Sequence, residues 1–152
     1  MRVDDRLIHG QVVVGWGQAV CPDRILLADD EIAESEWERE LYRAGVPPDF
    51  EVEFTTIEEA AQRVDELMRS AMRTLILVAD VHALVRLCND APQIREVNLG
   101  GLHMDGDRVR KLPYLFLSDE EAGQLRELGE RGVTITAQDL PTTTRVPLER
   151  LL

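Results

Sequence analysis

Near its amino terminus the chain reads Val3-Asp4-Asp5-Arg6-Leu7-Ile8-His9-Gly10-Gln11-Val12. This stretch places two carboxylates, a guanidinium and an imidazole close together, directly before a glycine and a run compatible with a helix. A neutral imidazole is a competent nucleophile near pH 7, and an arginine three positions away supplies paired donors to a phosphoryl group. The stretch therefore indicates a phosphoryl group carried on histidine.

Downstream of this stretch, short apolar runs alternate with segments of helical period, which is typical of a parallel sheet flanked by helices. The run 74–79 is almost continuously apolar, so we expect a strand covered on both faces. The predicted strands are 24–28, 51–55, 74–79, 95–99, 114–117 and 133–137, and the predicted helices are 10–20, 33–44, 56–68, 81–88 and 118–130.

Local signals fix some boundaries of these elements. Thr56 with Glu59, and Ser118 with Glu121, have the spacing of a capping box at a helix start. In the helix 33–44, the apolar residues Trp37, Leu41 and Tyr42 are expected on the inner side. Residues 102–113 are polar and predicted to be irregular, and the tail 141–152 receives no assignment.

Length and composition bound the class of protein. The 152 residues, of which 44% are hydrophobic and 30% charged, indicate a single globular domain over 1–152. A net charge of -12 argues against nucleic acid and anionic membrane surfaces as partners, and suits a partner with a basic rim. No apolar run is long enough to cross a membrane and no signal peptide is evident, so we expect a cytoplasmic protein without direct membrane insertion.

The stretch that begins Arg2-x-Asp4-Asp5 and continues through Val12 closely resembles the signature of the IIB component of the mannose/fructose/sorbose family of the bacterial sugar phosphotransferase system (PTS). Further landmarks of that family follow along the chain, namely 24–27 with Asp30-Glu31, Val46-Pro47-Pro48, 97–101 and Gly132-Val133. The resemblance implies an α/β fold with an open, mainly parallel seven-stranded sheet, helices on both faces, and the histidine in the loop that leaves the first strand.

The resemblance also implies a function. His9 stands at the position of the phosphorylated residue, with attachment at Nδ1. A IIA protein or domain would donate the phosphoryl group, and membrane IIC and IID subunits would use it on an imported sugar. The resemblance thus makes the chain a phosphotransferase component with a histidine phospho-intermediate.

The residues around His9 have expected roles in such a site. If the first helix begins at Gly10 or Gln11, its free N–H groups face the phosphoryl group, and Gly10 allows close approach. Arg6 would neutralise the phosphoryl oxygens, so that positioning and electrostatics suffice without a metal or another cofactor. Asp5, ahead of Asp4, is expected to accept a hydrogen bond from the non-reacting ring nitrogen or to hold Arg6 in place.

Other polar residues receive plainer interpretations. Asn98 is expected at the same sheet edge as His9, and Gly100-Gly101 is interpreted as a strand-ending turn that needs positive φ. His82 and His103 lack neighbours at metal-ligand spacing, although a parallel sheet brings the loop of His103 toward the crevice. Cys21 and Cys88 have no C-x-x-C spacing and are expected as reduced thiols.

The start of the chain departs from the family pattern, because Met1 directly precedes Arg2 where family members usually carry several apolar residues. If Met1 is the true start, we expect a first strand of about three residues. Its remaining place in the sheet would be filled by another segment, with the tail 141–152 as the candidate, or left as a groove beside His9.

Three other functions compete with sugar transport. A metal hydrolase using Asp4, Asp5, His9 and Asp29-Asp30 lacks any supporting ligand motif. A response-regulator receiver needs an aspartate after its third strand and a lysine after its fifth, where this chain has Thr55-Thr56 and Gly100-Gly101. A regulatory module that accepts phosphate on His9 without passing it to sugar needs the same histidine, and so stays open.

Overall fold

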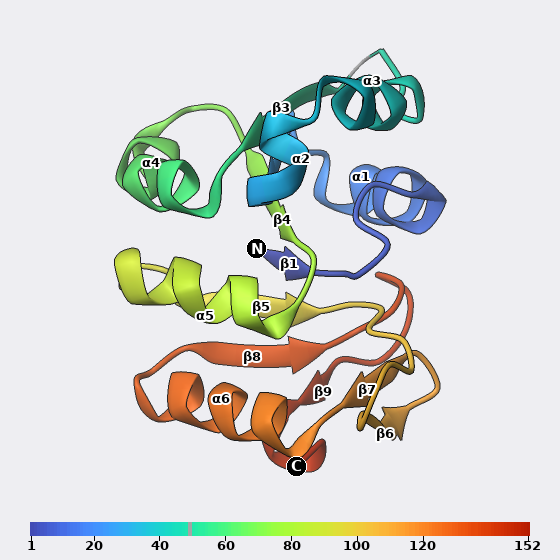
Figure 1. Ribbon diagram of the computed structural model, residues 1–152, viewed down its shortest axis with the longest axis vertical. Coiled ribbons are helices and arrows are strands. Elements are labelled where there is room, and N and C mark those ends of the chain that lie inside the picture. Colours follow the sequence, from blue (N-terminus) through green and yellow to red (C-terminus); the bar gives the residue numbers. More distant parts are fainter. Residues whose placement is uncertain (49) are drawn as a thin grey trace.

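The computed structural model describes residues 1–48 and 50–152, and its central feature is a seven-stranded sheet (Figure 1). Its strands are β1 (Arg2–Val3), β2 (Arg24–Ala28), β3 (Glu51–Thr55), β4 (Thr74–Val78), β5 (Glu96–Leu99), β8 (Thr134–Ala137) and β9 (Val146–Pro147). They lie in the order β3-β2-β4-β1-β5-β8-β9, and every neighbouring pair is parallel except β8 with β9. The expected open, mainly parallel sheet of seven strands is confirmed.

Helices cover both faces of this sheet, as expected. They are the π-helix η1 (Gln11–Trp16), the 3-10 helix η2 (Leu148–Arg150), and the α-helices α1 (Gly17–Val20), α2 (Asp30–Glu34), α3 (Glu36–Ala44), α4 (Ile57–Arg69), α5 (Val81–Asp90) and α6 (Asp119–Glu130). Within the described part of the chain, none of them is long and apolar enough to cross a membrane.

Alternation along the central strands divides the core into two layers. Leu26 and Ile76 pack with α4, α5 and α6 on one face, whereas Ile25 and Leu75 pack with η1 and Leu7 on the other. Successive strand residues point to opposite faces, so continuously apolar strands such as β4 need cover on both sides. Leu7 and Ile8, in the loop that follows β1, are thereby part of the core.

Two predicted segments differ from the structure. The helix expected over 33–44 is divided into α2 and α3 by Ser35, whose backbone is extended. Trp37 and Leu41 are not on an inner side, because they are 67% and 59% exposed. The segment 102–113 is not wholly irregular, since β6 (Val109–Leu112) pairs antiparallel with β7 (Leu115–Leu117) in a separate two-stranded ribbon.

The helix predicted over 10–20 begins as a π-helix and continues as α1. Such helices are rare and occur often at functional sites. The capping boxes at Thr56 and Ser118 are both present, so these two helix starts are confirmed.

The first strand is even shorter than expected, with two residues. Arg2 pairs with Leu77 and Asn98, whereas β4 and β5 extend further toward their amino ends without a neighbour between them. A groove of about 320 Å³ lies there, lined by the residues Met1, Arg2, Trp16, Val20, Thr74, Leu75, Glu96, Val97, Asn98, Thr134, Thr136 and Arg145. It is at the amino end of β1, away from His9, and the tail does not fill it because Val146–Pro147 pairs with β8.

Candidate functional site

The site is built on the loop that leaves the carboxyl end of β1, where β5 and β8 also end (Figure 1). This loop is held by its apolar members, because Leu7 and Ile8 are 4% and 8% exposed. Leu7 has a φ of 52°, in the left-handed region that non-glycine residues rarely adopt, and its N–H donates to the carbonyl of Asp4 at 2.9 Å. The loop therefore turns sharply and presents His9 at the sheet edge.

Hydrogen bonds at both ring nitrogens orient the His9 side chain. Nε2 lies 3.1 Å from Oδ1 of Asp4, and Nδ1 accepts from the backbone N–H of Gln11 at 3.4 Å. A carboxylate only accepts hydrogen bonds, so the proton belongs on Nε2 and the lone pair on Nδ1. The unprotonated nitrogen is therefore Nδ1, next to the start of η1.

Asp4 is the fully buried centre of the site. Its Oδ1 faces His9 and accepts the Arg6 N–H at 3.3 Å, while its Oδ2 accepts from Arg2 at 2.8 Å and from the Gly101 N–H at 3.2 Å. Burial by itself raises the pKa of the Asp4 carboxyl. The hydrogen bond with His9 and the charge of Arg2 outweigh that effect, and the pKa lies below its ordinary value. Asp4 is therefore ionised near neutral pH.

Arg2 holds Asp4 from the other side, a role that the sequence did not reveal. Its guanidinium is 1% exposed, donates to the side chain of Asn98 and to the carbonyls of Gln138 and Asp139, and stacks 4.8 Å from the centre of the Trp16 ring. The signal available in the sequence was Arg2 itself, a charged residue at the start of the first strand of the motif. A charge in such a position is buried only when it is paired.

Gly100 and Gly101 are not the positive-φ turn that the sequence suggested, since neither has a positive φ. The reason at Gly100 is space: a Cβ there would overlap the Arg2 guanidinium and stand 2.6 Å from Oδ2 of Asp4, whereas a Cβ at Gly101 would make only contacts of 3.4 Å or longer. The expectation that Asn98 lies at this edge is met, because its side chain contacts Arg2. The carboxyl end of β5 thus leaves room for the ion pair of Arg2 and Asp4.

Arg6 lies at the rim of the site with 43% of its side chain exposed. Its Nη2 donates to the side-chain oxygen of Gln11, and its Nε is 3.9 Å from Oδ1 of Asp4. Arg6 is therefore bound to the side chain of Gln11, the residue whose backbone N–H faces Nδ1 of His9. Gly10 has open space around it, since a Cβ there would meet nothing within 4 Å.

The sequence predicted that Asp5, rather than Asp4, contacts His9 or Arg6, and the structure reverses these two roles. Asp4, not Asp5, contacts His9 and Arg6, because a buried residue pointing back under the loop reaches the ring, whereas Asp5 points toward the next loop. There Asp5 accepts from the backbone N–H of His103 at 2.6 Å and faces its Nδ1 at 2.8 Å. His103 is therefore at this edge of the sheet, whereas His82 lies exposed at the start of α5.

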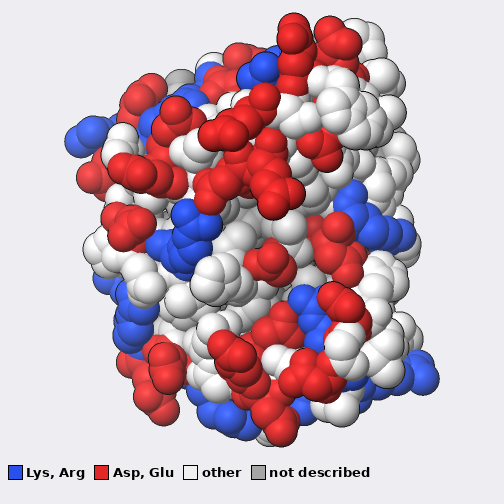
Figure 2. Space-filling model, viewed as in Figure 1, with Lys and Arg blue, Asp and Glu red and all other residues white. Residues whose placement is uncertain are grey.

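Charge is distributed unevenly around this framework. Figure 2 shows acidic side chains over much of the visible face, with Lys and Arg in smaller groups, in keeping with the net charge of -12. Among residues 1–48 and 50–152, no group of three or more His, Cys, Asp and Glu side chains has the arrangement of a metal site.

An imidazole held by a buried carboxylate, at the carboxyl edge of a parallel sheet, defines an α/β protein with an oriented histidine at that edge. The family model described as PTS system sorbose subfamily IIB component matches residues 1–152, and the chain belongs to that family. It is therefore a IIB component of a sugar phosphotransferase system.

Individual relatives agree with this assignment. The N-acetylgalactosamine-specific phosphotransferase enzyme IIB component 2 of Escherichia coli is 28% identical, with 99% of this chain and 96% of that protein covered. The solved IIBSor domain of the sorbose permease from Klebsiella pneumoniae is 25% identical, with 98% of this chain and 92% of that one covered and a TM-score of 0.87. The mannose-specific EIIAB component of Escherichia coli is 22% identical, with 99% of this chain and 47% of that protein covered.

Proposed function

We propose that the chain accepts a phosphoryl group on Nδ1 of His9 from a IIA protein or domain and passes it to a sugar imported by membrane IIC and IID subunits, on the cytoplasmic side. The observation that carries the proposal is the contact between Nε2 of His9 and the ionised Asp4, which leaves Nδ1 as the free nitrogen. The mannose-specific EIIAB relative, whose name joins IIA with IIB, supports a IIA partner.

The transfer needs no net proton movement at His9. The Nδ1 lone pair attacks phosphorus, the bond from phosphorus to the donor nitrogen breaks, and the donor ring leaves with that electron pair. The N–H at Nε2 stays in place, so the ring becomes cationic while its hydrogen bond to Asp4 strengthens. Arg2 keeps Asp4 ionised and correctly turned throughout.

In this proposal, groups near Nδ1 of His9 bind the phosphoryl oxygens. The Gln11 N–H already faces this nitrogen, and the Arg6 guanidinium is bound to the Gln11 side chain. Gly10 has no side chain and open space on that side. Fixed donors aimed at developing negative charge are the principal means by which proteins speed phosphoryl transfer.

Incubation with a phosphorylated IIA protein tests this proposal. The wild-type chain should take up a label that is labile in acid and stable in base, and phosphorus NMR should place it on Nδ1. His9→Ala should take up none, whereas the control His82→Ala, altered at an exposed histidine of α5, should be labelled normally. Label that persists in His9→Ala would refute the assignment.

A second assay separates transport from a purely regulatory role. Membranes containing the IIC and IID subunits, supplied with the labelled chain and a sugar of the mannose, fructose or sorbose class, should form sugar phosphate. Label that stays on the chain in the presence of every such sugar would favour the regulatory module.

A further inference from the structure

The aspartates of the dipeptide Asp4-Asp5 each hold one histidine. Asp4 holds Nε2 of His9, while Asp5 holds Nδ1 of His103 at 2.8 Å and also accepts its backbone N–H at 2.6 Å. Because Asp5 accepts through its carboxylate, Nδ1 of His103 carries a proton, and in the imidazolium form the opposite nitrogen, Nε2, is a second donor. Two imidazoles, each oriented by a carboxylate, therefore border the same loop.

Gly101 places the His103 ring close to Arg6. A Cβ built on Gly101 would be 3.4 Å from Cε1 of His103, 3.4 Å from Oδ1 of Asp4 and 3.7 Å from Nη2 of Arg6. Cε1 is the ring carbon bonded to both nitrogens, so the His103 ring and the Arg6 guanidinium border the same small space beside Gly101. The His103 side chain is 55% exposed and open to a docked partner.

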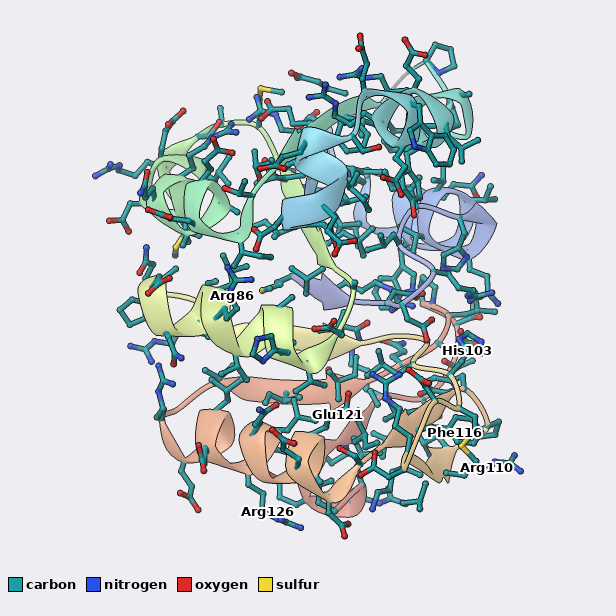
Figure 3. The ribbon with its side chains drawn as sticks, viewed as in Figure 1. Arg86, His103, Arg110, Phe116, Glu121 and Arg126 are labelled. Atoms are coloured by element: carbon teal, nitrogen blue, oxygen red, sulfur yellow. The ribbon has the colours of Figure 1, made fainter. Side chains whose placement is uncertain are left out.

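The main chain of His103 is fixed from a second direction. Arg108 donates to its carbonyl at 3.1 Å, and the same guanidinium forms a 2.6 Å ion pair with Glu121 of α6. Figure 3 shows His103 in the loop next to the β6–β7 ribbon, where Arg110 and Phe116 lie, with Glu121 on the neighbouring helix. The ring is thus oriented by Asp5 while its backbone is anchored to α6.

We propose that His103 is a second phosphoryl-binding residue, whose Nε2–H donates to an oxygen of the phosphoryl group while that group moves to or from His9. This role rests on the proposed function and deepens it. His103 moves no proton and forms no covalent bond; it adds a charge-assisted hydrogen bond beside Arg6. The donating form is the imidazolium, in which both ring nitrogens carry a proton.

Two substitutions separate binding through Nε2 from mere support of the loop. In His103→Asn the shorter amide takes the place of Nδ1, so the bond to Asp5 is kept and the phosphoryl donor is lost. In His103→Gln the longer amide reaches the place of Nε2, so the phosphoryl donor is kept and the bond to Asp5 is lost. We expect His103→Asn to slow labelling of His9 on the order of 10- to 100-fold, as when one donor to developing charge is removed.

The comparison with His103→Gln is the readout that a structural role would not give. His103→Gln should keep a transfer rate several-fold above that of His103→Asn, even where its melting temperature is the lower of the two. The control His82→Asn, at the exposed histidine of α5, should leave the rate unchanged.

Three results would overturn the assignment. Normal transfer in His103→Asn, equal slowing in both variants, or slower transfer in His103→Gln would each make His103 a support for the loop alone. A wild-type chain that takes no label from phosphorylated IIA would instead overturn the proposed function, and the role of His103 with it.

Discussion

At the scale of single residues, the site depends on one buried carboxylate that serves one imidazole and two guanidinium groups. Asp4 contacts His9 and Arg2 directly and lies 3.9 Å from Arg6. Its two oxygens have different partners: Oδ2 accepts from Arg2 and Gly101, whereas Oδ1 faces His9 and Arg6. Replacing groups around Asp4 should therefore separate effects on rate from effects on stability.

Arg6→Lys tests the effect on the rate of phosphoryl transfer. Lysine keeps the charge but loses the paired, planar donors of the guanidinium, so transfer to His9 should slow by about 10- to 100-fold, or about 1.4 to 2.7 kcal/mol. The side chain is 43% exposed, so the melting temperature should stay unchanged. A folded Arg6→Lys chain that transfers at the wild-type rate would mean that charge alone suffices.

At the scale of elements, the end of β5 and the start of β1 show how tightly the sheet is built around the site. Gly100 leaves no room for a side chain beside Arg2 and Asp4, whereas Gly123 in α6 has nothing within 4 Å of a built Cβ. The two glycines make a matched pair for substitution by alanine.

Gly100→Ala should destabilise the chain by about 1 to 3 kcal/mol, because overpacking displaces the buried ion pair. Gly123→Ala should stabilise it by about 0.5 to 1 kcal/mol, since alanine is the better helix former. Urea unfolding measures both, and labelling of His9 should fall only in Gly100→Ala. A neutral Gly100→Ala would show that the loop moves away at little cost.

The groove at the amino end of β1 gives a prediction for the sheet itself. Three apolar residues added before Met1 should extend β1 and pair with β4 and β5. Each added side chain that becomes fully buried should stabilise the fold by roughly 1.5 to 3 kcal/mol. The free energy of unfolding should rise by several kcal/mol in this variant. A Gly-Ser-Gly extension of equal length is the control, and an equal response to both extensions would contradict strand addition in the groove.

At the scale of the whole molecule, folding and the protonation of Asp4 are linked. The pKa of Asp4 lies below its ordinary value of 3.8 in the folded chain, so the carboxylate stabilises the fold above that pH. The contribution should be lost as the pH falls below 3.8 and through the lower pKa of the folded state, because protonation leaves Arg2 buried without its charged partner.

Asp4→Asn should make that contribution visible. Removing one partner of a buried ion pair costs about 3 to 5 kcal/mol, so the variant should be less stable by that amount at pH 7. The difference from wild type should shrink in acid, where Asp4 is protonated in the wild-type chain as well. A gap that stays constant from pH 7 to about pH 3 would place the cost in packing rather than charge.

Local pattern predicted much of this molecule. The capping boxes at Thr56 and Ser118, and the apolar run that forms β4, depend on neighbours in sequence, so their helices and strand were predicted from the residues alone. The ten-residue stretch around His9 also carried the family resemblance, because its chemistry is local to one loop. The family and its parallel sheet therefore followed from the sequence.

Tertiary structure alone decided which residues meet. Asp4 and Asp5 are adjacent in sequence and chemically identical, and only their burial against Arg2 or their exposure toward His103 distinguishes them. Arg2 contacts Gln138 and Asp139, and Gly100 is needed for a close approach across strands; neither fact is written in local sequence. Local propensity does not specify contacts between residues about a hundred positions apart, which arise only when the strands come together.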